Sequence, residues 1–285
     1  MGHGSGIGRA AMRLGKLGGM TYTAPKPPVP ETAVLTEDRG HVRILTLNRP
    51  ERRNALDLAD RGALLAALEE ADSDTGARAL VLTGAGPVFS AGGDIASMSP
   101  DPEVARIRLD TVNRIARQML TAGTPVVAAV EGGAYGLGLS LSCACDTVVA
   151  GRGADFAASF ARIGLVADTG LFYSLPKRVG AARARQLLMN ARTVPAEEAE
   201  RIGLADEVVD DGAALERAVA VAARLARWSA PMVAATRRIL SQPDQSLEAL
   251  LAAEAEAQIE LLAGPESAEG RAAFLERRRA DFVDP

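Results

Sequence analysis

The chain has 285 residues, of which 48% are hydrophobic and 24% charged, and these proportions exclude a largely disordered or fibrous protein. The net charge of -4 leaves no basic footprint for nucleic acid, and the apolar runs are too short for a membrane span of about 20 residues. Two cysteines and two histidines exclude a disulfide framework and argue against a histidine-rich metal site. We therefore expect a globular cytoplasmic protein that binds no metal and uses carboxylates, hydroxyls and backbone dipoles for its chemistry.

The first part of the chain predicts a leader followed by alternating strands and helices. Residues 1–31 are rich in Gly and Pro and lack apolar periodicity, so we expect a flexible leader there. Asp57 is a suitable N-cap for the first helix. The predicted strands are 33–37, 41–47, 79–83, 125–130 and 147–150, and the predicted helices among them are 57–71, 103–120 and 139–145.

The last part of the chain is predicted to be mostly helical. A short strand at 206–209 interrupts this pattern. Strands that alternate with helices through the first two thirds indicate an α/β core, and a long helical tail is suited to packing against other subunits. The predicted helices are 170–178, 181–190, 196–202, 212–228, 232–241, 246–262 and 265–279.

Two glycine-containing turns follow predicted strands, FSAGGD at 89–94 and EGGAYGLG at 131–138. Each turn can present unpaired backbone N–H groups at the start of a helix, where they stabilise negative charge. Two such groups directed at one point would form an oxyanion hole, in which each donor contributes about 10²–10³ in rate. Considered singly, either stretch could equally be a tight bend that needs glycine.

Together, and in this order, the two turns resemble the crotonase superfamily, the enoyl-CoA hydratase/isomerase family. The similarity covers roughly residues 33–282. The stretches that carry it are NRP at 48–50, NAL at 54–56, FSAGGDI at 89–95, TPVVAAVEGGAYGLGLSLSCACD at 124–146, FAASFARIGLVADTGLFYSLPKRVG at 156–180 and ARTVPAEEAERIGLADEVV at 191–209.

The resemblance implies an α/β fold in which a spiral of ββα turns forms an acyl-CoA-binding core over 32–210, with a helical C-terminal region at 211–285 that serves in oligomerisation. It implies an acyl-CoA thioester as substrate, with coenzyme A carried as part of the substrate rather than as a cofactor, and assembly into a homotrimer or a dimer of trimers. By motif position, the N–H groups of Ala91 and Leu137 would form the oxyanion hole. The residues implied to bind coenzyme A are Arg49, Asn54, Ala55, Leu56, Gly92, Asp94 and Ile95.

Two positions depart from the hydratases that this chain resembles. Those enzymes hold the attacking water between two glutamates, and the corresponding positions here are Ser140 and Phe160. A serine hydroxyl is far too weak a base for this step, and phenylalanine has no titratable group. We therefore expect inefficient hydration by the two-glutamate route, and a substrate pocket formed by Ser140, Phe160 and Leu165.

A carboxylate occurs nearby, at Asp168 in the segment GLVADTG at 164–170. The segment resembles the ring-modifying isomerases of phenylacetate breakdown and the 4-chlorobenzoyl-CoA dehalogenases, in which this aspartate acts on the substrate. The dehalogenases also use a histidine in the preceding helix, and 103–122 contains none. We predict that Asp168 is the single acid/base of an enoyl-CoA isomerase. The alternative role for Asp168 is to cap the helix predicted after it.

Two classes of function remain open on the sequence alone. The first is an enzyme, either an enoyl-CoA isomerase or an enoyl-CoA hydratase with non-standard catalytic residues. The second is a non-catalytic acyl-CoA binder that keeps the oxyanion hole and has lost the acid/base pair. Asp168 favours the enzyme, whereas the absence of both glutamates favours the binder.

Overall fold

A six-stranded sheet with the order β1-β2-β4-β6-β8-β11 forms the centre of the computed structural model, which describes residues 32–242 and 245–283. The predicted leader therefore lies outside the described residues. Strands β1 and β2 are antiparallel, and every other neighbouring pair in this sheet is parallel. The strands are β1 (Val34–Arg39), β2 (Val42–Leu47), β4 (Ala79–Gly84), β6 (Val126–Val130), β8 (Thr147–Gly151) and β11 (Glu207–Val209).

The central strands are almost entirely apolar because both faces of the sheet are covered, as is usual for parallel sheets. Alternate residues of each strand face opposite sides. Leu82 and Ala128 contribute to one hydrophobic cluster, whereas Val81 and Val127 contribute to the other. The continuous apolar runs seen in the sequence therefore divide between two cores.

Two smaller sheets bring the glycine-containing turns together. Gly92 has a φ of +104°, and a Cβ added there would lie 2.7 Å from the carbonyl oxygen of Tyr135, so only glycine allows this approach. A bridge between Ser90 and Ala134 joins the same two segments. One small sheet has the order β10-β9-β7 and the other is the pair β3-β5. These strands are β3 (Ala55–Leu56), β5 (Gly92–Gly93), β7 (Gly133–Tyr135), β9 (Asp155–Ala157) and β10 (Val194–Pro195).

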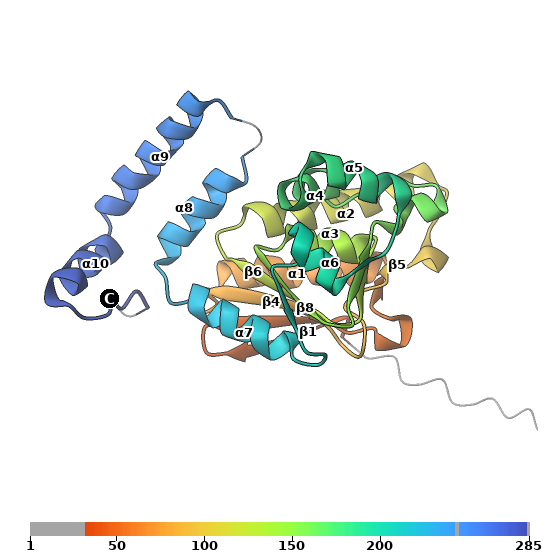
Figure 1. Ribbon diagram of the computed structural model, residues 1–285, viewed down its shortest axis with the longest axis horizontal. Coiled ribbons are helices and arrows are strands. Elements are labelled where there is room, and N and C mark those ends of the chain that lie inside the picture. Colours follow the sequence, from red (N-terminus) through yellow and green to blue (C-terminus); the bar gives the residue numbers. More distant parts are fainter. Residues whose placement is uncertain (1–31, 243–244, 284–285) are drawn as a thin grey trace, which may run out of the picture.

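Each helix predicted from the sequence is present, and Asp57 is the N-cap of α1 as expected, in a capping box with Asp60. Helices α1, α2 and α3 pack on one face of the sheet, and α7 packs on the other (Figure 1). The helices are α1 (Leu58–Ser73), α2 (Pro102–Thr121), α3 (Leu137–Ala144), α4 (Leu171–Val179), α5 (Ala181–Asn190), α6 (Ala196–Ile202), α7 (Ala214–Leu225), α8 (Ala230–Leu240), α9 (Leu247–Leu262) and α10 (Pro265–Glu276). Single 3₁₀ turns occur at η1 (Pro50–Arg52), η2 (Ile95–Ser97) and η3 (Ser159–Ile163).

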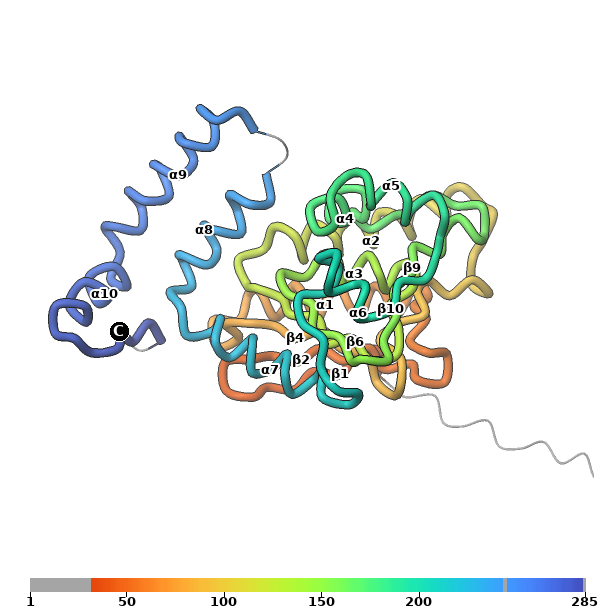
Figure 2. Tube along the Cα trace, in the orientation of Figure 1, coloured from red at the N-terminus to blue at the C-terminus, as the bar shows by residue number. Residues whose placement is uncertain are grey.

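Helices α8, α9 and α10 form a C-terminal arm that projects from the α/β body, as Figures 1 and 2 show. The buried side chain of Arg237 fixes α8 to the body, because it donates to the carbonyl groups of Met119 and Ala122 and pairs with Asp146. Helix α7 is the first helix of the helical region predicted at 211–285, and it packs on the sheet rather than in the arm. Helix α7 belongs to the core because its small apolar residues cover the sheet.

No helix within the two described ranges is both long enough and apolar enough to cross a membrane. The α/β class predicted from the sequence is confirmed by the sheet order and by the alternation of strands and helices.

Candidate functional site

A cavity of about 160 Å³ lies where the two glycine-containing turns meet. A cavity of this size is similar to one of about 150 Å³ that holds benzene, so it accommodates a group of about six carbon atoms. Ala91, Leu137, Phe160, Leu165 and Asp168, which the sequence predicts for the site, all contribute to its wall. The lining residues are Arg61, Ala91, Gly93, Ile95, Met98, Arg108, Gly136, Leu137, Ser159, Phe160, Arg162, Ile163, Leu165 and Asp168.

Leu137 is the first residue of α3, after Gly136 as the N-cap. The N–H groups of the first turn of a helix have no acceptor within the helix, and the helix dipole makes this end positive. The backbone N–H of Leu137 therefore meets the requirement for one donor of an oxyanion hole. Its side chain is buried in the larger core cluster and also forms part of the cavity wall.

The backbone N–H of Ala91 donates to the carbonyl oxygen of Arg53 at 2.8 Å, so the prediction that Ala91 supplies the second donor is wrong for this structure. Gly93, two residues later, also lines the cavity. The N–H of Asp94 donates to the carbonyl of Leu56 at 3.1 Å. Successive N–H groups of an extended segment point to opposite sides, so the N–H of Gly93 points away from β3, and Gly93 replaces Ala91 as the candidate donor.

Asp168 lies between η3 and α4, and its side chain lines the cavity. Thr169 and Gly170 have φ values of 56° and 72°, in the left-handed region, so the chain turns sharply after Asp168. Helix α4 begins at Leu171, and its N-cap is Gly170. The Asp168 carboxylate therefore does not cap α4, and the alternative role considered for it is wrong. Only the backbone carbonyl of Asp168 takes part, by accepting from the N–H of Leu171 at 3.1 Å.

Burial raises the pKa of Asp168 above its usual value of 3.8. The hydroxyl of Thr169 donates to Oδ1 of Asp168 at 2.9 Å, and the charges of Arg61 and Arg108 also favour the ionised form, but burial outweighs all three. A raised pKa makes the ionised carboxyl group a stronger base and keeps the protonated form populated at higher pH than for an exposed aspartate. The environment of Asp168 is therefore suited to acid/base chemistry.

Phe160 and Leu165 line the cavity as predicted, but Ser140 does not. Ser140 is fully buried, and its Oγ lies 3.1 Å from the carbonyl oxygen of Asp168 and 3.3 Å from that of Gly136. The assignment of Ser140 to the pocket is thus corrected. The side chain of Ser140 is engaged with the backbone behind the cavity and supports the segment that carries Asp168.

Two arginines in the cavity wall, Arg61 and Arg108, are not singled out by the sequence analysis. Arg61 is only 2% exposed. Within the described part of the chain, Nε and Nη1 of Arg61 and Nε of Arg108 have no hydrogen-bond partner. Burial, together with the like charge of Arg108, lowers the pKa of Arg61 to about 10. One sequence signal could have found Arg61, because it shares the buried face of α1 with Leu64, Leu65 and Leu68.

Asn54 and Leu56, which the resemblance assigns to coenzyme A, are both 0% exposed. The side-chain amide of Asn54 donates to the carbonyls of Ala85 and Val88 at 2.9 and 2.7 Å, and its Oδ1 accepts from the backbone N–H of Arg49 at 2.8 Å. These contacts correct the assignment for both side chains. Leu56 is a core residue, and Asn54 ties the NAL segment to the end of β4.

The charged residues of the implied coenzyme A site are engaged in ion pairs. Arg49 pairs with the buried Asp60 at 3.0 Å. Asp94 pairs with Arg52 at 3.2 Å, and its side chain also accepts from the N–H of Ala96 at 3.1 Å, which makes it the N-cap of η2. The charges of Arg49 and Asp94 therefore stabilise the local structure through ion pairs within the protein.

The remaining residues of the implied coenzyme A site differ in their access to solvent. Ile95 is 59% exposed and also lines the cavity, so it can contact a substrate at the cavity mouth. Ala55 is partly exposed, whereas Gly92 is buried where the two turns touch.

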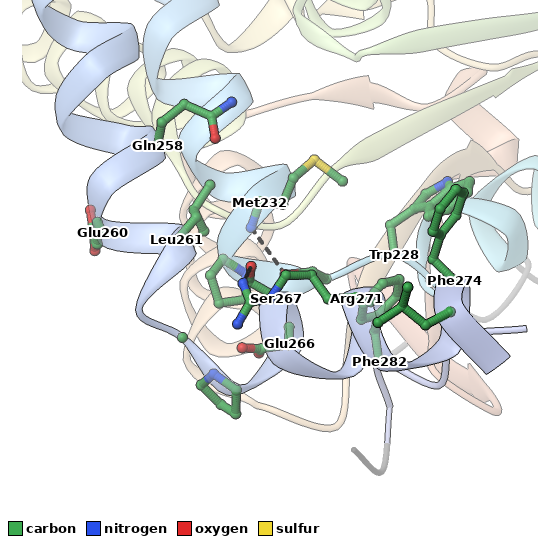
Figure 3. Close-up of a pocket in the computed structure, with 16 residues that line it drawn as sticks. Trp228, Met232, Gln258, Glu260, Leu261, Glu266, Ser267, Arg271, Phe274 and Phe282 are labelled. Carbon is green, nitrogen blue, oxygen red and sulfur yellow. Dashed lines mark hydrogen bonds between the residues drawn. The ribbon is translucent and has the colours of Figure 1, made fainter.

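A second and larger hollow, of about 880 Å³, lies in the C-terminal arm (Figure 3). None of its lining residues borders the cavity that contains Asp168. Its wall is largely apolar, and Figure 3 shows Trp228, Met232, Leu261, Phe274 and Phe282 among the residues around it. Because it lacks the backbone donors and the carboxylate described above, this hollow is not the candidate catalytic site.

Comparisons with known proteins show which family the chain is similar to. A family model described as "Enoyl-CoA hydratase/isomerase" matches residues 37–285. A Rhodobacter capsulatus protein named "Probable enoyl-CoA hydratase" is 40% identical over 249 residues, which are 84% of this chain and 93% of that protein. The 2,3-dehydroadipyl-CoA hydratase of Escherichia coli is 34% identical, with 87% of this chain and 98% of that protein covered.

The fold is also shared with solved structures. A crystal structure of an enoyl-CoA hydratase from Polaromonas sp. JS666 has a TM-score of 0.83 and 34% identity, and covers 87% of this chain and 98% of that chain. The crotonase-type fold that the resemblance implies is thereby confirmed, and so is the class of acyl-CoA enzyme. This chain belongs to the enoyl-CoA hydratase/isomerase family.

Proposed function

We propose that this enzyme moves the double bond of an enoyl-CoA from the 3,4 to the 2,3 position, with Asp168 as the single acid/base. One observation carries the proposal: among the described residues that line the cavity, Asp168 is the only acidic one. The two positions that hold glutamates in the hydratases contain Ser140 and Phe160. Ser140 is engaged with the backbone, and Phe160 has no proton to exchange.

The reaction needs only two proton transfers. The carboxylate of Asp168 removes a proton from C2, and the electron pair of the C–H bond moves into a dienolate that places negative charge on the thioester oxygen. The carboxylic acid of Asp168 then returns the proton to C4, and the double bond forms between C2 and C3. No electrons leave the substrate, so we propose that coenzyme A, as part of the substrate, is the only cofactor group involved.

The N–H groups of Leu137 and Gly93 would bind the thioester oxygen as it gains charge. Support comes from their positions, since Leu137 begins α3 and both residues line the cavity. Donors that are fixed before the reaction stabilise developing charge without reorganisation. The pantetheine arm would enter beside Ile95, the exposed member of the residues implied to contact coenzyme A, and the partly exposed Ala55.

Hydration is a second candidate reaction, favoured by the names of the relatives, one of which is a 2,3-dehydroadipyl-CoA hydratase. Hydration adds the hydroxyl group of water to C3 and a proton to C2. Asp168 would have to take a proton from the attacking water, and either Asp168 or that water would have to supply the proton for C2. A binder without catalysis is the third candidate. The raised pKa of Asp168 at the cavity wall supports an enzyme over a binder.

The test uses a short 3-enoyl-CoA that carries deuterium at C2. A single base predicts a conjugated 2-enoyl-CoA with part of the deuterium transferred to C4, as detected by ultraviolet absorbance and mass spectrometry. A 3-hydroxyacyl product formed from the 2-enoyl-CoA would instead support hydration, and no product from either substrate would support the binder. Complete loss of the deuterium to solvent under every condition tested would contradict its transfer from C2 to C4 by a single base that is shielded from water.

We also propose that the chain assembles as a homotrimer or a dimer of trimers through the C-terminal arm. The support is the exposure of apolar side chains there, since Phe274 is 83% exposed and Leu275 is 80% exposed. Apolar patches of this kind mark interaction surfaces. Light scattering should give a mass of three or six chains, and Leu275→Asp should lower it. A single chain of 29.6 kDa at micromolar concentration would contradict the proposal.

A further inference from the structure

Arg61 and Arg108 place two guanidinium groups in the wall of the cavity without a protein partner at three of their nitrogens. Arg61 is 2% exposed, and its Nε and Nη1, like Nε of Arg108, have no hydrogen-bond partner among the described residues. Arginine and other charged residues are rarely fully buried unless they are paired. A buried, unpaired arginine at a cavity indicates a site for an anion that arrives with the ligand.

The acidic groups around Arg61 form no ion pair with it within the described residues. Asp57 and Asp94 are close enough to favour the charge of Arg61, but their carboxylates contact Arg52, and Nε and Nη1 of Arg61 are left without an acceptor. Asp168 is the remaining acidic group at the cavity, and the structure forms no ion pair between it and either arginine within the described residues. Within the cavity wall two guanidinium groups therefore face one carboxylate, and Nε and Nη1 of Arg61 and Nε of Arg108 have no acceptor among the described residues.

The third arginine of the cavity wall is already engaged. Arg162 is exposed, and its Nη2 donates to the carbonyl of Ala191 at 2.7 Å and lies 3.4 Å from Oγ1 of Thr193. It therefore stands at the rim rather than holding free donors inside. The unpaired charge of the cavity belongs to Arg61 and Arg108.

The position of Arg61 limits how far an anion can be from the thioester. A Cβ added at Gly93 would lie 2.6 Å from Nη2 of Arg61, so the guanidinium packs directly against the backbone of this candidate oxyanion donor. The cavity, at about 160 Å³, also admits only a short acyl group. An anion bound by this arginine is therefore separated from the thioester carbonyl by only a few carbon atoms.

We infer that the acyl group of the substrate ends in a carboxylate, bound by Arg61 and Arg108, so that the substrate class is the mono-CoA thioesters of short dicarboxylic acids. This inference rests on the proposed function only for the presence of an acyl-CoA in the cavity. A carboxylate satisfies both the charge of the pair and the fork geometry of guanidinium groups. An uncharged acyl chain would leave Nε and Nη1 of the buried Arg61 and Nε of the partly buried Arg108 without an acceptor.

The test measures binding of unreactive saturated thioesters, so it does not depend on which reaction Asp168 performs. The probes are the CoA thioesters of propanedioic, pentanedioic and hexanedioic acids, each compared with its own terminal amide by isothermal titration calorimetry. The amide has the same shape and lacks only the charge. We expect at least one acid to bind the wild-type protein at least tenfold more tightly than its amide.

Variants assign this preference to the two arginines. Arg108→Gln and Arg61→Met should each reduce the acid-to-amide preference to less than threefold, mainly by weakening the binding of the acid. The control is Arg114→Gln, on the same helix as Arg108, because Arg114 pairs with Glu69 on the surface and should leave the preference unchanged. Arg108 is only partly buried, so its variant remains informative if Arg61→Met fails to fold.

The outcomes separate the two proposals. Equal binding of acid and amide at all three lengths would overturn the carboxylate inference and leave the acyl-CoA function standing, and so would a preference that survives both variants. Failure of every thioester to bind would contradict the proposed function itself, and the inference would be withdrawn with it.

Discussion

The hydroxyl of Ser140 lies 3.1 Å from the backbone carbonyl oxygen of Asp168. Ser140 occupies one of the two positions that hold glutamates in the hydratases, Asp168 is the candidate acid/base, and the structure places them in contact. The same carbonyl accepts from the N–H of Leu171, so the backbone of Asp168 is held from two sides. The carboxylate is left to face the cavity, and among the described residues only the hydroxyl of Thr169 donates a hydrogen bond to it.

Asp168→Asn tests the role of this carboxylate. The variant keeps the size of the side chain but cannot abstract a proton, so we expect isomerase turnover to fall by about 10²–10⁴-fold, as for a lost general base. Affinity for a saturated acyl-CoA should stay within a few-fold, because Leu137 and Gly93 are unchanged. Asp110→Asn, at an exposed position of α2, is the matched control. Full turnover by Asp168→Asn on every accepted substrate would end the single-base mechanism.

The same variant makes a separate prediction about stability. The pKa of Asp168 is raised in the folded protein, so the ionised form is disfavoured by folding, and this penalty is absent at low pH and present once the pH exceeds the folded pKa. Asn carries no charge to desolvate. The melting temperature of Asp168→Asn at neutral pH should therefore equal or exceed that of the wild type. A fall of several degrees would show that the carboxylate has a structural partner.

The oxyanion hole can be tested at Leu137 by comparing Leu137→Pro with Leu137→Ala. Both variants lose the buried side chain, and its removal costs about 2–5 kcal/mol in either case. Only proline lacks the backbone N–H, and the first position of a helix is the one that tolerates proline. Turnover should be about 10²–10³-fold lower for proline than for alanine. Equal rates for the two variants would remove this N–H from the mechanism.

Much of the fold could be predicted from the sequence because the long elements have strong patterns. The apolar runs of β4 and β6 and the helical spacing of α1 are read directly, and each helix lies within a few residues of its expected range. The strands of the two small sheets, β3, β5, β7, β9 and β10, are missed. They have only two or three residues each and depend on tertiary pairing rather than on local preference.

The sequence motifs locate the segments of the site but not the contacts made within them. The motif locates the turn at Gly92, but it does not reveal which N–H is already used, and the bond from Ala91 to Arg53 becomes visible only in three dimensions. Arg61 escapes notice for a similar reason, since a charged residue in a helix is normally exposed. Its burial follows from the packing of α1 against the β5 turn.

Arg61→Met should increase stability in the absence of ligand. The fall in the pKa of Arg61 from 12.5 to about 10 means that folding disfavours the charged form, by about 3 kcal/mol when converted at 1.36 kcal/mol per unit. Because the folded pKa lies below the unfolded one, this penalty is fully present at neutral pH and disappears only as the pH rises above both values. Methionine packs in the same apolar surroundings without a charge.

Urea unfolding at neutral pH measures this effect, and we expect the free energy of unfolding to rise by up to about 3 kcal/mol. Arg114→Gln, which removes a surface charge from α2, should change it by less than about 0.5 kcal/mol. A clear loss of stability in Arg61→Met would show that the guanidinium has an acceptor and would weaken the case for a ligand site.

The pH dependence of kcat/KM tests whether the charge of Arg108 acts on the pKa of Asp168. The base must be ionised to take a proton, so kcat/KM should fall as the pH drops through the pKa of Asp168 in the free enzyme, which lies above 3.8. The positive charge of Arg108 lowers this pKa, and its removal in Arg108→Gln should raise it further. The acidic limb of the profile should therefore move to higher pH in Arg108→Gln. The substrate for this measurement is a 3-enoyl-CoA with an uncharged acyl chain, whose binding does not need the arginine. Arg114→Gln should leave the limb in place. A shift to lower pH in Arg108→Gln would mean that a group other than Asp168 controls the acidic limb.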